Sequence, residues 1–378
     1  MYHRSRVITM SAKAAGITMT CLAAYLLAAD AGNTSQPPVS WDKKAAATYL
    51  DGRENWWMNW PRAARDHGTF CVSCHTAVPY AISRPALRPV LGEKTATVNE
   101  QKLIDNVTMR VRLWKEVDPW YSDENVGVHK TSESRGTESI LNAFILSNHD
   151  AQTGTLSADT RLAFANMWAL QQQAGNEKGA WAWYHFDNQP WEASDSQYYG
   201  AALAAIAVGT APQDYRSSPE IQANLNSLRE YLGGHASKQS PLNRVILLWV
   251  SAKLPGTLQP GDALPIIKEI FSKQQEDGGW SSTSLIGPWK RHDGTPLETM
   301  SDGYATGLAI YVLGQAGITR RNLQMNLGLS WLVKNQDKTE GRWLAYSLNK
   351  KRDLSSDTGP FMNDAATAYA VLALTQAK

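Results

Sequence analysis

The residues with the clearest chemical potential lie together in segment 68–76, GTFCVSCHT. The segment contains two cysteines separated by two residues, and a histidine directly follows the second cysteine. At this spacing two thiols form thioether bonds to the vinyl groups of a haem, and the adjacent imidazole binds the iron. Cys71, Cys74 and His75 are therefore candidate residues for holding a covalent haem c, with His75 as the proximal iron ligand.

The same three residues allow two other chemistries. A CxxC pair forms a disulfide in an oxidising compartment, and Cys71, Cys74 and His75 would bind zinc together with one further ligand. Cys21 is the only other cysteine, and it falls in a predicted signal peptide. Cys71 and Cys74 are thus the cysteines expected in the mature chain.

A haem iron can take a sixth ligand, for which imidazole and thioether groups are common donors. Most histidines of the chain fall in the longer connections between predicted helices, and Met58 is a further candidate. The candidates are His67, His129, His185, His292 and Met58, with His235 in a comparable position. An open sixth position would instead bind a small molecule.

Four carboxylates stand near the start of similar apolar segments: Glu138, Asp195, Asp302 and Asp364. Thr, Ser or Asn precedes each of them, which is typical of a helix N-cap followed by an acidic first turn. Such carboxylates stabilise a helix by about 0.3–1 kcal/mol each. The alternative is a ring of carboxylates at a cavity mouth, where one member with a raised pKa acts as an acid.

The apolar segments predict the elements that position these residues. They begin near residues 75, 138, 195, 243, 302 and 364, and most are apolar nearly all round, as buried helices are. An amphipathic segment precedes each one, at 42–57, 99–116, 158–173, 219–232, 262–275 and 320–336. Six such pairs predict an all-α fold, an (α/α)6 toroid of six helical hairpins with the apolar helices inside.

The connections between the predicted helices are of two kinds. Those from an outer to an inner helix are mostly near 20 residues, and those in the other direction are mostly about 4–13. One rim should therefore carry most of the loops, which often carry function. Cys74 and His75 take the place in the first repeat that the carboxylates take in others. A haem held there would lie at the mouth of the ring.

Several long connections share a Gln…Gly-x-Trp pattern, at residues 167–181, 275–280 and 328–343. With the closing stretch TGPF at 358–361, the chain resembles the squalene–hopene cyclase and prenyltransferase repeat superfamily, best from residue 158 onward. The resemblance implies an (α/α)6 toroid with an aromatic-lined cavity for isoprenoid chains. The tryptophans of the pattern are expected to be structural clamps between hairpins. Segment 70–76 also looks like the attachment segment of many cytochromes c.

The catalytic motifs of that superfamily are absent. No two Asp residues stand two apart, so the D-x-D-D motif that protonates an alkene cannot be present, and D-D-x-x-D is missing too. No cysteine follows Cys74, so the zinc ligands of protein prenyltransferases are not reproduced. A shared fold alone does not transfer an activity.

The N-terminus and the composition indicate where the protein works. A positively charged start followed by an apolar stretch at 14–29 predicts a signal peptide over residues 1–31. Residues 32–378 are then expected to form a single domain, periplasmic or otherwise exported, without an integral membrane span. A net charge of only +2 gives no reason to expect a nucleic-acid partner.

Three functions fit these observations. The first is an exported haem protein that transfers electrons to a redox partner, or oxidises an apolar small molecule such as an isoprenoid. The second is a divergent terpenoid cyclase or isomerase with a rim carboxylate such as Asp302 or Asp364 as its acid. The third is a non-catalytic interaction module, in which Cys71 and Cys74 form a disulfide.

Overall fold

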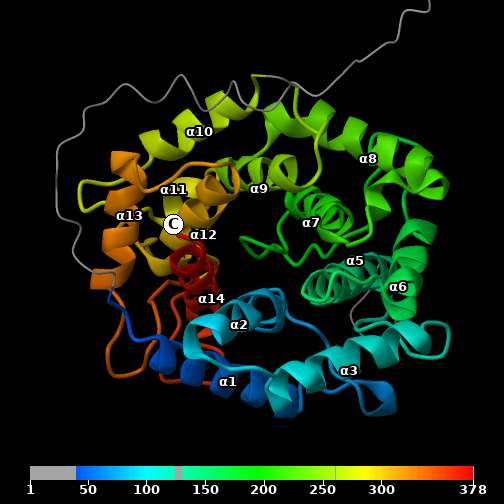
Figure 1. The fold of residues 1–378 in the computed structure, drawn as a ribbon, viewed down its shortest axis with the longest axis horizontal. Helices are drawn as coiled ribbons and strands as arrows, with labels where there is room; N and C mark the ends of the chain where they lie inside the picture. The colour runs from blue at the N-terminus through cyan, green and yellow to red at the C-terminus, as the bar shows by residue number, and fades with distance from the viewer. Residues whose placement is uncertain (1–39, 124–129, 260, 378) are drawn as a thin grey trace, which may run out of the picture. The chain divides into compact units, whose positions relative to one another are not determined.

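An inner ring of apolar helices forms the centre of the computed structural model, which describes residues 40–123, 130–259 and 261–377. These helices are α2 (Ala77–Leu91), α5 (Lys130–Ala151), α7 (Ser196–Thr210), α9 (Pro241–Lys253), α12 (Gly303–Gln315) and α14 (Phe361–Gln376). Each one contacts the next in this order, and α14 packs against α2 (Figure 1). The inner ring is therefore closed.

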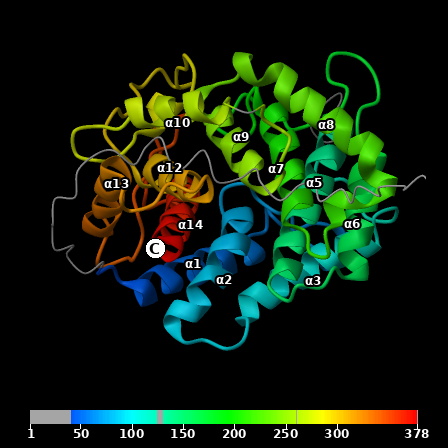
Figure 2. The ribbon, with the colours of Figure 1, turned by 45° about the horizontal axis from the view of Figure 1, so that its top comes forward.

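A second set of helices surrounds this ring (Figures 1 and 2). They are α1 (Lys43–Asn59), α3 (Val98–Arg112), α6 (Ala158–Ala169), α8 (Gln222–His235), α10 (Ala263–Ser272) and α13 (Leu323–Lys334). The short helix α11 (Ser282–Leu285) and several 3-10 turns lie in the connections. The predicted all-α toroid of paired helices is thus confirmed. The predicted signal peptide and His129 lie outside the described residues.

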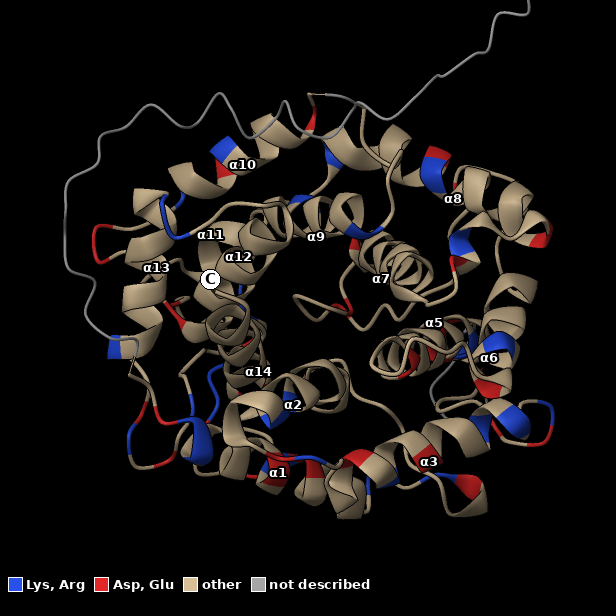
Figure 3. Ribbon diagram, viewed as in Figure 1, with Lys and Arg blue, Asp and Glu red and all other residues tan. Residues whose placement is uncertain are grey.

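The inner helices pack closely because of their composition. Helices α7 and α12 contain no charged residue, and charged side chains lie mainly on the outer helices and loops (Figure 3). Small residues bring the inner backbones together. A Cβ atom added at Gly307 of α12 would lie 2.6 Å from the backbone nitrogen of Ala370 in α14. Only glycine permits this approach. Within the described part of the chain, no helix is long and apolar enough to cross a membrane.

Two details of the predicted helix starts are wrong. Glu138 is not in a first turn, because α5 already begins at Lys130 and Glu138 lies in its middle. Asp195 and Asp302 are themselves the N-caps of α7 and α12, rather than the residues after the caps. Only Asp302 caps with its side chain, which accepts a hydrogen bond from the Ala305 amide at 3.0 Å. Asp364 does lie in the first turn of α14.

The tryptophans of the Gln…Gly-x-Trp pattern are fully buried between hairpins. Each indole N–H donates to a carbonyl oxygen of the preceding outer helix: Trp181 to Met167 at 2.6 Å, Trp280 to Ile270 at 2.7 Å and Trp343 to Leu332 at 2.7 Å. Because a buried indole N–H needs an acceptor, these bonds fix each loop against its own helix. The residues act as structural clamps.

The glutamines of the same pattern join neighbouring hairpins. Each side-chain amide donates to one carbonyl in its own loop and to one at the next outer helix: Gln171 to Gly179 and Asn224, Gln274 to Gly278 and Gln324, and Gln336 to Gly341 and Asp42. In the middle copy the bridging residue is Gln274, not the neighbouring Gln275 of the sequence pattern. Asp42 is the N-cap of α1, so Gln336 connects the last hairpin to the first.

Replacing Gln336 tests this closing contact. The side chain exchanges bonds with both backbone groups of Asp42, at 2.7 and 2.8 Å, and it binds the Gly341 carbonyl. We expect Gln336→Ala to lower the free energy of unfolding by roughly 2–4 kcal/mol, because it removes the three hydrogen bonds of this side chain. Urea denaturation followed by circular dichroism measures the change. The control Gln101→Ala, at an exposed helix position, should change it by less than about 0.5 kcal/mol. Equal values for the two variants would contradict the role of Gln336.

Aromatic side chains pack against one another along the inner ring. Ring centroids are 5.1–6.4 Å apart in a continuous series, Trp191–Tyr304–Tyr369–Tyr311–Trp249–Phe144. All six side chains are buried. These aromatic residues therefore form one continuous buried cluster, and the isoprenoid cavity that the resemblance implies stays a prediction.

Candidate functional site

The connection between α1 and α2 carries the CxxCH motif and is held by short-range backbone bonds. Arg65 N–H donates to Thr69 O at 2.7 Å, and Cys71 N–H donates to Ala63 O at 2.8 Å. Asn106 of α3 accepts from the Phe70 amide at 2.8 Å and donates to the Phe70 carbonyl at 3.1 Å. These bonds fix the backbone that enters the motif.

Both cysteines of the motif are free thiols in the structure. Cys71 is 6% exposed and Cys74 is 8% exposed, so neither thiol is open to bulk solvent. Burial raises the pKa of Cys71 to about 11 and that of Cys74 well above its usual value. Both groups are therefore protonated at neutral pH. Among the described residues, no three or more His, Cys, Asp or Glu side chains are grouped as a metal site needs.

His75 lies in the turn before α2 and is surrounded by aromatic rings. Phe361 of α14 stacks on the imidazole with 3.7 Å between centroids, and Trp57 of α1 meets it edge-on at 5.0 Å. Trp191 lies 6.4 Å away, from the connection before α7. Burial lowers the pKa of His75 well below its ordinary value, and the charges of Arg53 and Arg352 act in the same direction. The imidazole is thus neutral at physiological pH.

A hydrogen-bond chain orients this neutral imidazole. The Thr76 hydroxyl donates to Asp364 Oδ2 at 2.7 Å, and its oxygen lies 2.7 Å from His75 Nδ1. Because the hydroxyl proton points to the carboxylate, the Thr76 oxygen must accept from Nδ1–H. The proton therefore resides on Nδ1, and Nε2 keeps its lone pair. This tautomer is the one in which a histidine binds a metal through Nε2.

Asp364 is the one rim carboxylate that the structure brings to the motif. In addition to Thr76, it accepts from Tyr49 Oη and Arg53 Nε, each at 2.8 Å. Burial raises the pKa of Asp364, while Arg53 and the hydrogen bonds oppose that rise. These three donors, two from α1 and one from segment 68–76, compensate the buried carboxylate for its loss of water.

Glu54 is a buried carboxyl that the sequence analysis missed. It lies on α1 with no exposed surface, and neither side-chain oxygen has a hydrogen-bond partner among the described residues. Burial, together with the negative charges of Asp364 and Asp51, raises the pKa of Glu54 to about 8. The sequence does contain a signal, because Glu54 shares the helix face of buried Leu50 and Trp57.

The pKa of Glu54 makes stability depend on pH. The folded state holds this proton up to about pH 8, whereas the unfolded state releases it near the ordinary value of 4.5. The contribution of Glu54 to folding is thus fully present below pH 4.5 and is lost as pH rises towards 8. We expect Glu54→Gln, which keeps a neutral side chain of the same shape, to raise the unfolding free energy at pH 8 by roughly 3–5 kcal/mol relative to wild type.

Denaturation at pH 5 and pH 8 measures this effect. At pH 5 the variant and the wild type should differ far less than at pH 8. The control Glu230→Gln, at an exposed position of α8, should follow the wild-type profile at both values. A Glu54→Gln profile parallel to that of wild type would show that Glu54 is ionised in the folded protein.

Glu138 serves the motif indirectly. It is fully buried in α5 and forms a two-bond ion pair with Arg110 of α3, at 2.5 and 3.1 Å. Arg110 also donates to Asp66 Oδ1 at 3.2 Å and Thr69 Oγ1 at 2.8 Å, just before the motif. Burial alone would lower the pKa of Arg110, but the bonds to Glu138 leave it raised. Glu138 therefore fixes the position of the motif rather than acting as a rim acid.

Removing one partner of this buried pair should be costly. We expect Glu138→Gln to lower the unfolding free energy by about 3–5 kcal/mol, because Arg110 remains buried without its counter-charge. The matched control is Asp159→Asn in α6, whose partner is the exposed Arg112 of α3, the helix that also carries Arg110. That change should cost less than about 1 kcal/mol. Thermal or urea unfolding of both variants decides the matter, and a small effect at Glu138 would refute the anchoring role.

The remaining two carboxylates have separate partners. Asp302 is buried and accepts from the Ser282 amide at 2.6 Å and the Ser282 hydroxyl at 2.9 Å. Burial raises its pKa to about 6, against the effect of these bonds. Asp195 is half-buried and accepts from the Asn243 side chain at 3.2 Å. The four carboxylates thus serve four local networks, which favours the capping and packing interpretation over a ring of acids.

The described candidates for a sixth ligand have contacts of their own. His67 Nδ1 lies 3.1 Å from Asp66 Oδ2, and His292 Nε2 lies 3.8 Å from Asp187 Oδ2. His185 is exposed, and Met58 is half-buried in α1. His235 ends α8 rather than lying in a connection. The rings that contact His75 belong instead to Trp57, Trp191 and Phe361.

The connection between α6 and α7 contains a loop around residues 186–192 that the sequence patterns do not single out, and this loop passes near His75. Figure 1 shows it beside α7, reaching into the space that the inner helices enclose. Gln189 and Asn349 exchange two hydrogen bonds of 2.8 Å between the third and sixth repeats. The loop places Trp191 between His75 and Tyr304, and it carries the half-buried Glu192, whose pKa desolvation raises to about 7.

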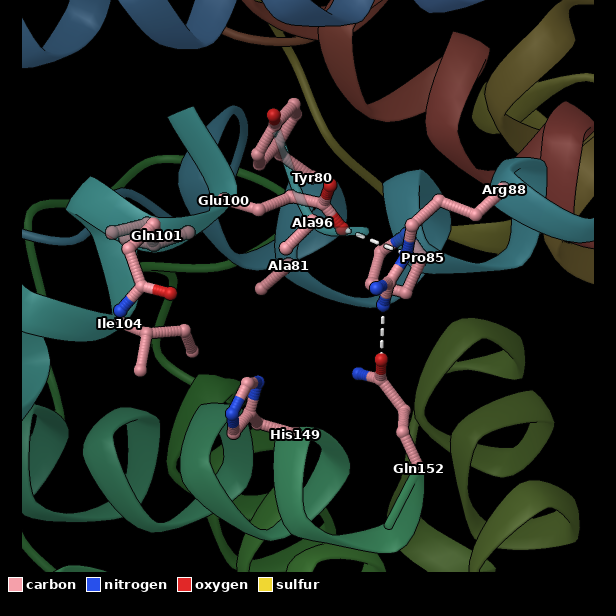
Figure 4. Close-up of a pocket in the computed structure, with 11 residues that line it drawn as sticks. Tyr80, Ala81, Pro85, Arg88, Ala96, Glu100, Gln101, Ile104, His149 and Gln152 are labelled. Carbon is pink, nitrogen blue, oxygen red and sulfur yellow. Dashed lines mark hydrogen bonds and ion pairs between the residues drawn. The ribbon is translucent and has the colours of Figure 1, made fainter. Parts of the chain in front are cut away.

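A small cleft lies away from the motif, between α2, α3 and the end of α5 (Figure 4). It encloses about 360 Å³, including solvent at its open side. Arg88 lies between Glu100 and Gln152 and binds both, and His149 lies across from them. Because its polar groups bind one another, this cleft has no chemistry comparable to that of the motif.

Comparisons with known proteins give no family assignment. No protein-family model matches the chain, and no curated protein matches its sequence. A solved structure with a similar arrangement is a glycosidase variant in complex with glucose, at 12% identity and a TM-score of 0.46. The alignment covers 89% of this chain and 99% of the glycosidase. A similarity of this size says nothing about the activity of the chain.

Proposed function

We propose that this protein is an exported c-type haem protein that transfers electrons. Cys71 and Cys74 would hold the haem through thioether bonds, and His75 would bind its iron. The observation that carries the proposal is the state of these three groups. The two thiols are free, and the imidazole is neutral, with its proton on Nδ1 and its lone pair on Nε2.

The donor set fits this group better than the alternatives. Thioether formation consumes protonated, unpaired thiols, and both cysteines are in that state. A zinc site would need a further ligand beside Cys71, Cys74 and His75. In the described part of the chain no such cluster occurs.

When bound, a haem supplies one-electron chemistry, and the protein supplies orientation and a dry environment. Asp364 and Thr76 hold the Nδ1 proton and thereby fix the direction of His75 Nε2. Phe361 and Trp57 pack against the imidazole and would restrict its rotation. Hydrogen bonding at Nδ1 also raises the basicity of the ligand.

Electron transfer is favoured over oxidation of an apolar substrate by the packing of the ring. The buried aromatic side chains from Trp191 to Phe144 pack against one another. Their apolar surfaces are therefore covered by protein and not by a substrate. A cyclase or isomerase is disfavoured because Asp302 and Asp364 already accept several hydrogen bonds each. A redox partner protein is the expected recipient of the electrons.

Haem attachment is directly testable. The full chain is produced with its N-terminal segment in a bacterial periplasm that has a haem-maturation system. We expect the mature chain to keep haem absorbance after denaturing electrophoresis, and its intact mass to increase by one haem. Cys71→Ala with Cys74→Ala should abolish this covalent signal.

The control Val72→Ala keeps the spacing of the thiols and should retain the haem. A colourless wild-type band would overturn the proposal. An intact mass lower by two hydrogens would assign a disulfide instead.

A further inference from the structure

The loop at residues 186–192 is held together by its own backbone bonds. The Glu192 amide donates to Asn188 O at 2.8 Å, while the Phe186 and Asn188 amides both donate to Glu192 O, at 2.9 and 3.1 Å. These bonds close a short antiparallel turn that is complete without a partner from a helix. Because its internal bonds survive a displacement, the turn can move as one body.

The end of this loop lies over the motif. The ring of Trp191 lies 6.4 Å from that of His75. Burial, and next the negative charge of Glu192, raises the pKa of Cys74, so the carboxyl lies close to this thiol. The loop therefore covers the side of the motif that carries Cys74 and His75.

The other two rings that contact His75 belong to helices of the toroid. Trp57 lies within α1 and Phe361 begins α14, so moving either ring requires a packed helix to shift. Trp191 belongs to a connection instead. Local opening costs least in segments that make few buried contacts. Of these three covers, the loop is the one that can open while the ring of helices stays closed.

Polar contacts fasten the tip of the loop to the fifth and sixth repeats. The Gln189 amide donates to Asn349 Oδ1 and the Asn349 side chain donates to Gln189 O, both at 2.8 Å. Asp187 Oδ2 lies 3.8 Å from His292 Nε2, and the His292 amide donates to Asn349 O at 2.8 Å. The side chain of Asn349 thus makes both bonds to the backbone of the tip, and its release frees the loop.

We propose that the 186–192 loop is a lid that controls the access of small molecules to Cys74 and His75 in the finished ring, with the Asn349 side chain as its latch. In the closed position Trp191 covers the imidazole. Opening breaks the two bonds at Gln189 and moves Trp191 and Glu192 away together. The inference goes beyond the proposed function and does not require a haem.

Thiol labelling of the full chain with free cysteines tests the lid. The probe is iodoacetamide, and peptide mass mapping measures its rate of reaction with Cys74. Below the unfolding transition this rate should be nearly independent of urea, because opening a short loop exposes little surface. Hydrogen exchange of the peptide that contains Gln189 should give the same opening constant. A labelling rate that rises with urea as steeply as global unfolding would overturn the lid.

Asn349→Ala removes both bonds of the latch, and we expect it to speed the labelling of Cys74 roughly tenfold. The matched control is Gln376→Ala, at the opposite end of α14, whose side chain bonds to Tyr311 O and to Gln315, each at 2.7 Å. It should leave the labelling rate unchanged.

Equal acceleration in the two variants, or none in Asn349→Ala, would overturn the lid. Should Asn349→Ala not fold, the urea dependence of the wild type decides. Because labelling reports on the thiol and not on haem, a wild-type chain that never acquires haem but shows this pattern would overturn the proposed function alone.

Discussion

The bonds between Gln336 and Asp42 are the constraint on which the remaining structure depends. They join the last hairpin to the first, so that no hairpin leaves an apolar face without a neighbour. The same closure packs α14 against α2. It thereby brings Asp364 to Thr76, although 288 positions separate them in the chain. The orientation of His75 is a product of ring closure and not of the motif alone.

Several carboxyl groups near the motif are buried, and they differ in the hydrogen-bond donors that surround them. Glu138 meets a buried guanidinium, Asp364 meets three donors, and Glu54 meets none. Burial favours the neutral acid in each case, and the available donors decide how far that tendency prevails. Charge is therefore kept where it holds the motif in place, at Arg110 and Arg53, and is suppressed at Glu54.

The hairpins were predictable because helical periodicity is a local property. The start of α5 was not, because residues 130–137 are polar or small and lack an apolar pattern. They are helical because tertiary packing needs them: a Cβ atom added at Gly136 would lie 2.0 Å from the carbonyl oxygen of Ala182. The local sequence around Asp364 or Thr76 does not predict that the two residues are partners, since only the closed ring makes them neighbours. The burial of Glu54 was readable from its helix face.

The position of the motif has a consequence for biosynthesis. Cys71, Cys74 and His75 belong to the first hairpin to be made, whereas Asp364 and Phe361, which orient and cover the imidazole, belong to the last. During synthesis the cysteines therefore emerge well before their surroundings exist. In that interval the thiols are exposed to enzymes and cofactors that the finished ring would exclude. The order of synthesis thus provides a period for modification, which ends when α14 docks.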